Sequence, residues 1–290
     1  MFAHPATAKG RSTPVFLFKI VILLIITALV LSACGRRGGP SIGRMETPRE
    51  LTPENYPAKG IPSRYGDTKP HEWEGIAPDR YQVHGIDAAR YQGEIDFFAA
   101  KGAGISFAWL KATEGGDHID PGYEVNAPRA RAAGVPVGAY HFYYFCRTPE
   151  EQARWFIENV PRRAGDLPPV LDMEWNHQSR NCRTFPEPAE VHRIIRTYTQ
   201  IVQAHYGTAP VVYVTPDFYE ENSLGSLGGI EFWLRSTAAH PSERYPGERW
   251  SFWQYSGTGV APGIKGNVDL NAFAGDYSQW AGWLAARVQR

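Results

Sequence analysis

The sequence has no excess of charge of either sign. Its 290 residues include 30 lysines and arginines and 30 aspartates and glutamates. The first 33 residues hold three of the basic residues and no acidic one, which leaves 27 basic and 30 acidic residues in the rest of the chain. Proteins that bind nucleic acids usually carry a concentrated basic patch. The composition therefore argues against a nucleic-acid partner.

The chain also lacks a hydrophobic run long enough to cross a membrane. The longest run, residues 20–31, is well short of the roughly 20 residues that a membrane-spanning helix needs. Basic residues precede this run, and small residues follow it at positions 32 and 33. This order of segments is typical of a secretory signal peptide. We therefore interpret residues 1–33 as a signal peptide that is removed on export.

The end of this segment, Leu31-Ser32-Ala33-Cys34, resembles the lipobox of bacterial lipoproteins, in which the chain is cut before a cysteine that is then lipidated. The resemblance implies that Cys34 is a lipidated N-terminus, and ordinary secretion is the alternative. Several acyl chains hold a protein stably on a membrane surface. Gly35 follows, where an aspartate would suggest retention at the inner membrane. We therefore expect the protein to be anchored to the outer membrane and to face the periplasm.

Cysteine and metal-binding motifs are scarce. Of three cysteines, only Cys146 and Cys182 lie beyond Cys34. Cysteines pair in oxidising compartments, and each of these two follows the end of a predicted strand, so we predict a disulfide between them near the site. Two buried free thiols are the alternative. Residues 71–74 (His-Glu-Trp-Glu) lack the second histidine of a zinc-binding helix, and we expect neither a metal nor another cofactor.

Apolar periodicity is nearly absent between residues 34 and 80, where proline, glycine, arginine and glutamate are common. Such a segment cannot bury enough apolar surface to offset the entropy lost on ordering. We expect a linker that can lie partly against the following domain. Residues 81–290 are rich in aromatic residues and have the length of one domain.

Short apolar runs alternate with helical patterns through residues 81–290, which predicts an α/β fold. We expect a single (β/α)-barrel-like domain with eight strands. The predicted strands cover residues 83–87, 106–112, 136–144, 169–174, 211–214, 230–234, 251–255 and 268–270. The predicted helices cover residues 95–101, 123–133, 148–159 and 188–206. Later connections are too short or too glycine-rich for full helices, so the later part of the barrel should be helix-poor.

Two carboxylates, Asp172 and Glu174, stand at the C-terminal end of the fourth predicted strand. Residues two apart in a strand face the same way, about 6.5 Å apart. Two acids this close raise the pKa of one of them, as a general acid working at neutral pH requires. A (β/α) barrel has its active site at this end of its strands. The pair therefore predicts acid–base catalysis, and two solvated surface acids are the alternative.

Motifs at the other strand ends complete a pattern. They are Gly-Ile-Asp (85–87), Lys-Ala-Thr-Glu-Gly (111–115), Gly-Ala-Tyr-His-Phe (138–142), Trp-Gln-Tyr (253–255) and Val-Asp-Leu-Asn (268–271). Together with the Asp172 and Glu174 pair, their order resembles that of the glycoside hydrolase family 25 lysozymes, the Chalaropsis-type N-acetylmuramidases. The resemblance spans residues 83–273. It implies cleavage of the β-1,4 bond between N-acetylmuramic acid and N-acetylglucosamine in peptidoglycan.

The resemblance also implies roles for the acids. Glu174 is the catalytic acid, Asp172 is its carboxylate partner, and Asp87 and Asp269 are the other site acids. Glu174 would protonate the leaving glycosidic oxygen while positive charge develops on the sugar ring. Asp172 could act as a nucleophile, orient the N-acetyl group of the substrate or activate water, and the sequence leaves these three open.

Aromatic side chains near the strand ends are candidate stacking surfaces for sugar rings, and core packing is the alternative for each. They are Tyr140, Phe142, Tyr144, Trp175, Tyr213, Trp253 and Tyr255. His141 should lie on the opposite face of its strand from Tyr140 and be structural. Lys111 and Glu114 should form an ion pair that shapes the floor of the cleft.

Two segments, residues 88–91 and 230–236, differ from the family pattern and can alter substrate contacts while leaving the acids in place.

The alternative function is a catalytically silent lipoprotein that binds peptidoglycan and tethers the membrane to the wall. A third reading is a barrel glycosidase acting on another N-acetylated glycan, such as chitin. The longer acidic pattern of that class is missing, because Leu167 and Val170 stand where it has aspartates. We expect a monomer.

Overall fold

The computed structural model describes residues 60–290. The predicted signal peptide, Cys34 and the predicted linker up to residue 59 lie outside the described residues. Within residues 60–290, no helix is long and apolar enough to cross a membrane. In the same part of the chain, no cluster of His, Cys, Asp and Glu side chains could hold a metal ion.

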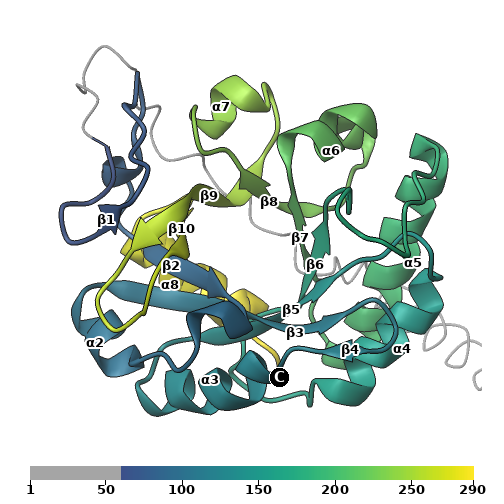
Figure 1. Ribbon diagram of the computed structural model, residues 1–290, viewed down its shortest axis with the longest axis horizontal. Coiled ribbons are helices and arrows are strands. Elements are labelled where there is room, and N and C mark those ends of the chain that lie inside the picture. Colours follow the sequence, from purple (N-terminus) through teal and green to yellow (C-terminus); the bar gives the residue numbers. More distant parts are fainter. Residues whose placement is uncertain (1–59) are drawn as a thin grey trace, which may run out of the picture. The chain divides into compact units, whose positions relative to one another are not determined.

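Eight strands form a closed barrel (Figure 1). They are β2 (His84–Ala88), β3 (Ile105–Glu114), β5 (Val137–Phe142), β6 (Val170–Met173), β7 (Val211–Val214), β8 (Glu231–Arg235), β9 (Trp250–Val260) and β10 (Val268–Phe273). Neighbouring strands from β2 round to β9 are parallel. Strand β10 closes the barrel between β9 and β2 and is antiparallel to both. The predicted eight-stranded α/β barrel is confirmed.

Two short strands lie beside the barrel strands. Strand β1 (Gly66–Asp67) pairs with β9, and β4 (His118–Ile119) pairs with the end of β3. Three 3₁₀ turns complete the connections between elements. They are η2 (Pro78–Arg80), η3 (Arg90–Gln92) and η4 (Leu224–Ser226).

Helices surround the barrel, and the longer ones follow the early strands (Figure 1). The four predicted helices are α2 (Phe97–Gly102), α3 (Pro121–Ala132), α4 (Pro149–Asn159) and α5 (Pro188–Tyr206). Helix α4 begins with a capping box between Thr148 and Glu151. After β7 the connecting helices α6 (Pro216–Glu221) and α7 (Pro241–Arg244) are short, so the later barrel is helix-poor.

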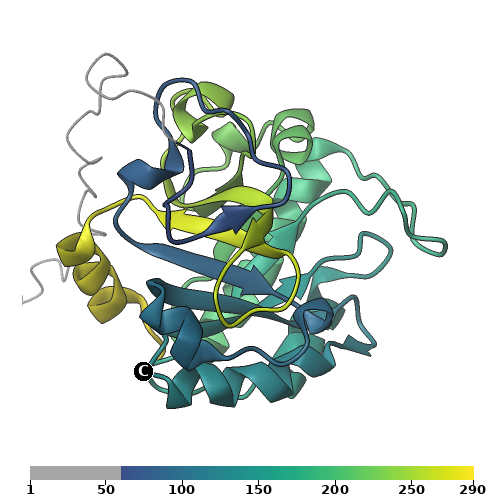
Figure 2. The ribbon, with the colours of Figure 1, turned by 60° about the vertical axis from the view of Figure 1, so that its left-hand side comes forward.

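Helix α8 (Tyr277–Arg287), which the sequence analysis did not predict, covers one end of the barrel. Trp280 and Trp283 of α8 pack against Phe252 and Phe273. Phe273 ends β10, and because β10 is antiparallel to its neighbours, this is the end where the parallel strands begin. Figure 2 shows α8 at the left, beside the C-terminus. Helix α8 does not cover the opposite end of the barrel, where the parallel strands have their C-terminal ends, so a functional site can lie there.

Side chains alternate along each strand between the barrel interior and the layer under the helices. Interior positions form one aromatic-rich cluster that includes Phe107, Trp109 and Trp233, whereas intervening residues such as Ala108 and Leu234 belong to the outer layer. Motif glycines make room for the interior rings. A Cβ at Gly85 would lie 2.3 Å from Phe107, and one at Gly138 would lie 2.4 Å from the Trp109 indole nitrogen. Any larger residue at either position would clash with an interior ring, so both positions require glycine.

The folded domain begins before the predicted boundary at Tyr81. Trp73 is only 5% exposed, and its ring meets the Trp253 ring edge-on with 5.2 Å between centroids. Tyr65 and Ala77 are also buried, and β1 adds to the barrel sheet. Residues 60–80, which we predicted to be linker, therefore lie partly against the barrel, as that prediction allowed, because a few aromatic side chains pack there without any apolar periodicity in the sequence.

Candidate active site

The four predicted acids, Asp87, Asp172, Glu174 and Asp269, line one cavity of about 340 Å³. Asp87 lies near the end of β2, Asp172 lies in β6, and Glu174 directly follows β6. Asp269 lies at the start of β10. Because β10 is antiparallel to β2, its start lies beside the end of β2, and Asp269 is the register partner of Asp87. The reversed strand thus brings the fourth acid to the same end of the barrel.

Asp87 and Asp269 act as one interacting pair, in which Asp87 is buried and Asp269 is partly exposed. Asp87 is 7% exposed, and its Oδ1 accepts hydrogen bonds from Asn271 Nδ2 at 2.8 Å and Gln254 Nε2 at 3.0 Å. Burial raises the pKa of Asp87. Burial, the charge of Asp87 and a hydrogen bond with it raise the pKa of Asp269 to about 9. At neutral pH, Asp269 therefore holds a proton that it donates to Asp87.

Asp172 and Glu174 form the second pair. Asp172 is 8% exposed, and its Oδ1 is buried without a hydrogen-bond partner among residues 60–290. Burial and then the charge of Glu174 raise the pKa of Asp172 well above its usual range. The pKa of Glu174 is also raised, mainly by burial and further by Asp217, while Arg235 opposes the shift. Burial is the larger cause for both acids, whereas the sequence analysis considered only their mutual repulsion.

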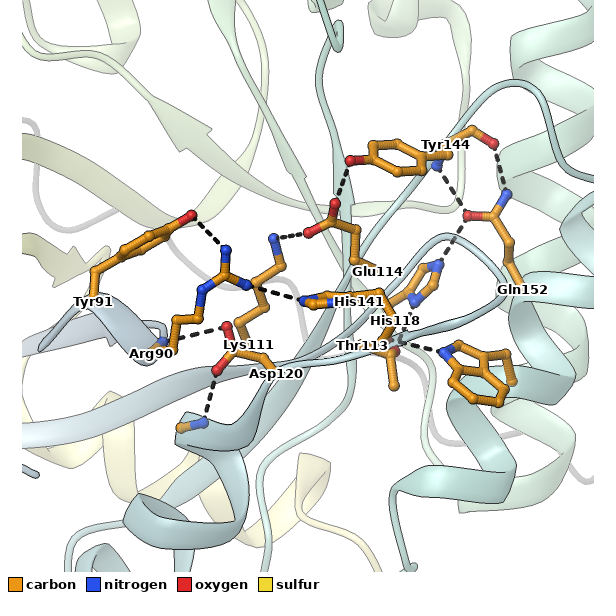
Figure 3. A network of polar contacts seen from close by, with 12 residues as sticks. Arg90, Tyr91, Lys111, Thr113, Glu114, His118, Asp120, His141, Tyr144 and Gln152 are labelled. Atoms are coloured by element: carbon orange, nitrogen blue, oxygen red, sulfur yellow. Dashed lines mark hydrogen bonds and ion pairs between the residues drawn. The ribbon is translucent and has the colours of Figure 1, made fainter. Parts of the chain in front are cut away.

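Two cations share this cavity. Lys111 Nζ donates to Glu114 Oε2 at 2.5 Å, so the predicted ion pair is present, and Glu114 also accepts a hydrogen bond from the Tyr144 hydroxyl (Figure 3). The guanidinium of Arg235, at the end of β8, has no hydrogen-bond or ion-pair partner within residues 60–290. The cavity therefore contains one paired cation and one unpaired cation.

Three of the seven predicted aromatic residues line the cavity, namely Tyr140, Phe142 and Tyr213. The Tyr213 hydroxyl donates to Gln254 Oε1 at 2.9 Å, which links it to the amide that binds Asp87. Tyr144 and Trp175 lie outside the cavity lining, and their polar groups bind Glu114 and Glu221. Their partial exposure leaves them able to contact a longer substrate.

The prediction that Trp253 and Tyr255 bind substrate was wrong. Their side chains are 0% and 1% exposed and belong to the outer layer of β9, where Tyr255 binds His84 Nδ1 at 3.0 Å. The residue between them, Gln254, faces the cavity instead. Strand alternation puts both aromatics on one side, but the sequence does not tell which side faces the barrel interior.

His141 is structural, as predicted from its position opposite Tyr140. Its ring is fully buried, and burial lowers its pKa to about 4, so it is neutral. Its Nε2 donates to Gln152 Oε1 at 3.1 Å and its Nδ1 accepts from the Thr113 hydroxyl at 2.7 Å (Figure 3). Gln152 in turn accepts a hydrogen bond from the backbone N–H of Tyr144 and donates one to the carbonyl oxygen of Tyr144. His141 thus supports the loop after β5.

The sequence analysis did not assign Trp233, Arg235 and Gln254 to the site. All three line the cavity. Residues 230–236 were noted only as a departure from the family pattern. The position of Arg235 at the C-terminal end of a barrel strand was a usable signal, because side chains there point toward the active site of this fold.

A disulfide joins the loops that follow β5 and β6. Cys146 and Cys182 are bonded, with 5.5 Å between their Cα atoms, which is the pairing expected from the sequence. The second loop begins with Glu174 and Trp175. The crosslink therefore restrains the segment that carries one of the site acids.

Buried carboxyl groups with raised pKa values can donate protons at neutral pH, and ionised neighbours can stabilise a nearby positive charge. The cavity offers both, with aromatic faces beside them. This combination suits cleavage of a glycosidic bond, in which an oxygen is protonated as positive charge develops on a sugar ring.

Comparison with known proteins agrees with this chemistry. The family model for glycosyl hydrolases family 25 matches residues 86–264. Lysozyme M1 of Streptomyces globisporus is 35% identical over 212 residues, which cover 68% of this chain and 69% of that protein. The protein YegX of Escherichia coli K12 is 34% identical over 206 residues, which cover 68% of this chain and 72% of that protein.

Solved structures show the same barrel. A family 25 glycosyl hydrolase from Bacillus anthracis has a TM-score of 0.65 and 32% identity, covering 70% of this chain and 94% of that chain. A lysozyme from Streptomyces coelicolor has a TM-score of 0.60 and 33% identity, covering 68% of this chain and 94% of that chain.

Proposed function

The chain belongs to glycosyl hydrolase family 25, and on this basis we propose that it is a muramidase that cleaves the β-1,4 bond between N-acetylmuramic acid and N-acetylglucosamine in peptidoglycan. The observation that carries the proposal is the cavity in which Asp87, Asp172, Glu174 and Asp269 converge. Lysozymes among its relatives support the same substrate. The chain is thus a glycoside hydrolase.

Glu174 is the proton donor in this proposal. Burial raises its pKa, which is the direction that a proton donor to the leaving glycosidic oxygen requires. Asp172 lies on the same side of the β6 segment and, once ionised, stabilises the positive charge that develops on the sugar ring. Asp87, held by Asn271 and Gln254, adds a further carboxyl group from the opposite wall.

The aromatic residues of the cavity bind the glycan. Tyr140, Phe142 and Tyr213 present ring faces or edges to the cavity, and such rings stack on the apolar faces of sugars. Their positions on β5 and β7, on either side of β6, support a binding mode in which the scissile bond lies over Asp172 and Glu174.

We also propose that Cys34 carries a lipid and that the segment after it connects a monomeric enzyme on the outer membrane to periplasmic peptidoglycan. The support is the lipobox-like sequence ending at Cys34. Mass spectrometry of the N-terminal peptide and membrane fractionation test this proposal. A Cys34→Ser variant should lose both the acyl mass and the membrane association, and a wild-type peptide without acyl groups would contradict the proposal.

The enzymatic proposal is tested by digesting purified peptidoglycan with the full chain and analysing released fragments by mass spectrometry. Products should end in reducing N-acetylmuramic acid. Glu174→Gln should lower the rate by about 100- to 10,000-fold, the usual contribution of a general acid. Glu158→Gln, at an exposed position on α4, is the matched control and should keep full activity. Binding to the wall without release of fragments would instead favour a tethering protein.

A further inference from the structure

We propose that Arg235 recognises the 3-O-lactyl carboxylate of N-acetylmuramic acid and so makes the enzyme selective for glycan strands that have lost their peptides. The inference rests on the proposed muramidase function. In such a reaction the muramic acid residue donates the anomeric carbon, so it occupies the cavity beside Glu174. Arg235 lines the same cavity.

Arg235 points into the barrel by strand alternation. Trp233 belongs to the interior cluster and Leu234 to the outer layer, so Arg235 returns to the interior side. It is also the register partner of Gln254, whose amide binds Asp87. Arg235 therefore lies on the wall of the cavity that is shared with the site acids.

The backbone around Arg235 is held rigidly. The Tyr245 hydroxyl donates to the carbonyl oxygen of Arg235 at 2.6 Å, and the indole N–H of Trp253 donates to the carbonyl oxygen of Ser236 at 2.7 Å. The N–H of Ser236 donates to Gln254 O at 2.9 Å. Buried hydrogen bonds of this kind pre-position a side chain for binding.

The guanidinium of Arg235 is available for a ligand. Lys111, the other cation of the cavity, is already paired with Glu114. Arg235 has no partner among the described residues, although it is close enough to Glu174 and Asp269 to influence both electrostatically. Its planar group carries five N–H donors that match the two oxygens of a carboxylate.

The chemistry of the substrate supplies one matching anion. N-acetylglucosamine is neutral, and N-acetylmuramic acid differs from it by a lactyl ether on O3. The lactyl carboxyl is ionised when it is free and becomes a neutral amide when a peptide is attached. Hydrolysis of that amide bond, by an enzyme of the amidase class, is therefore the reaction that must supply the preferred substrate.

Two substrates that differ only in this group test the inference. Peptide-free glycan strands are compared with the same strands after conversion of the lactyl carboxylate to a primary amide. The wild-type enzyme should have a kcat/KM about 10- to 100-fold higher on the free carboxylate, the effect of one charge-assisted hydrogen bond. Arg235→Gln should cleave both substrates at similar rates, and Arg235→Lys should retain part of the preference.

Arg249→Gln is the matched control, because Arg249 is exposed and precedes β9 at the other end of the barrel. It should keep the wild-type preference. Equal rates of the wild type on the two substrates would overturn the inference and leave the muramidase function intact. An Arg235→Gln variant that is slower on both by the same factor, with a displaced pH profile, would also overturn it, because Arg235 would then act only through Glu174. Cleavage of neither substrate by the wild type would overturn the muramidase function itself.

Discussion

Asp87 and Asp269 are register partners on antiparallel strands, and their carboxyl groups share one proton inside the barrel. Their separation in the sequence hides this relationship, which depends on β10 running against its neighbours. At neutral pH the pair therefore supplies at least one protonated carboxyl, that of Asp269, to this wall of the cavity.

Asp269→Asn should change the pH dependence of stability. The pKa of Asp269 is about 9 in the folded protein and about 3.9 in the unfolded chain. Between these values the folded state keeps a proton that the unfolded state releases, so stability is lost as pH rises. Asparagine cannot ionise. In urea unfolding, the wild type should therefore lose at least about 1 kcal/mol more than the variant between pH 4 and pH 8, and parallel profiles would refute the shared proton.

Lys111→Met should move the acidic limb of the kcat/KM profile to higher pH. Burial and Glu174 raise the pKa of Asp172, and the charge of Lys111 opposes this rise. Without the lysine, Asp172 ionises only at higher pH. Glu114→Gln, which keeps the lysine charge, is the control and should not shift this limb upward. An unchanged limb in Lys111→Met would show that ionisation of Asp172 does not limit the reaction.

Two tyrosine-to-phenylalanine variants should separate site residues from core residues. Tyr213→Phe removes the hydroxyl that binds Gln254 and should lower kcat/KM by about 10-fold. Tyr255→Phe removes a buried hydrogen bond to His84 and should lower the free energy of unfolding by about 1–2 kcal/mol. Its KM should stay unchanged. A raised KM in Tyr255→Phe would restore this residue to the substrate site.

Removing the disulfide should destabilise the domain. The bond joins residues 36 positions apart, and closing a loop of this length typically stabilises the folded state by about 2–4 kcal/mol. In denaturant unfolding, the double variant Cys146→Ser/Cys182→Ser should therefore have a free energy of unfolding that is lower by that amount. Treating the wild type with a dithiol reductant should give the same curve. Coincident curves for variant and oxidised wild type would contradict this prediction.

The strands and the long helices could be predicted because their signals are local. Alternation of apolar residues marks a strand and a capping box marks the start of α4, whatever the rest of the chain does. Helix α8 escaped prediction because its two buried tryptophans cover the end of a barrel that exists only after folding. The burial of Trp73 was not predicted for a similar reason, since its partner Trp253 lies on β9, far from it in the sequence.

The alternation of strands and helices, the acids at the strand ends and the family pattern can all be recognised in the sequence, because each depends on residues close together in the chain. In contrast, the folded barrel was needed to show that Gln254, not Trp253 or Tyr255, faces the cavity and that Arg235 lies there beside the acids. The facing of a strand is set by the register and closure of the whole barrel, and a shift of one residue would reverse it.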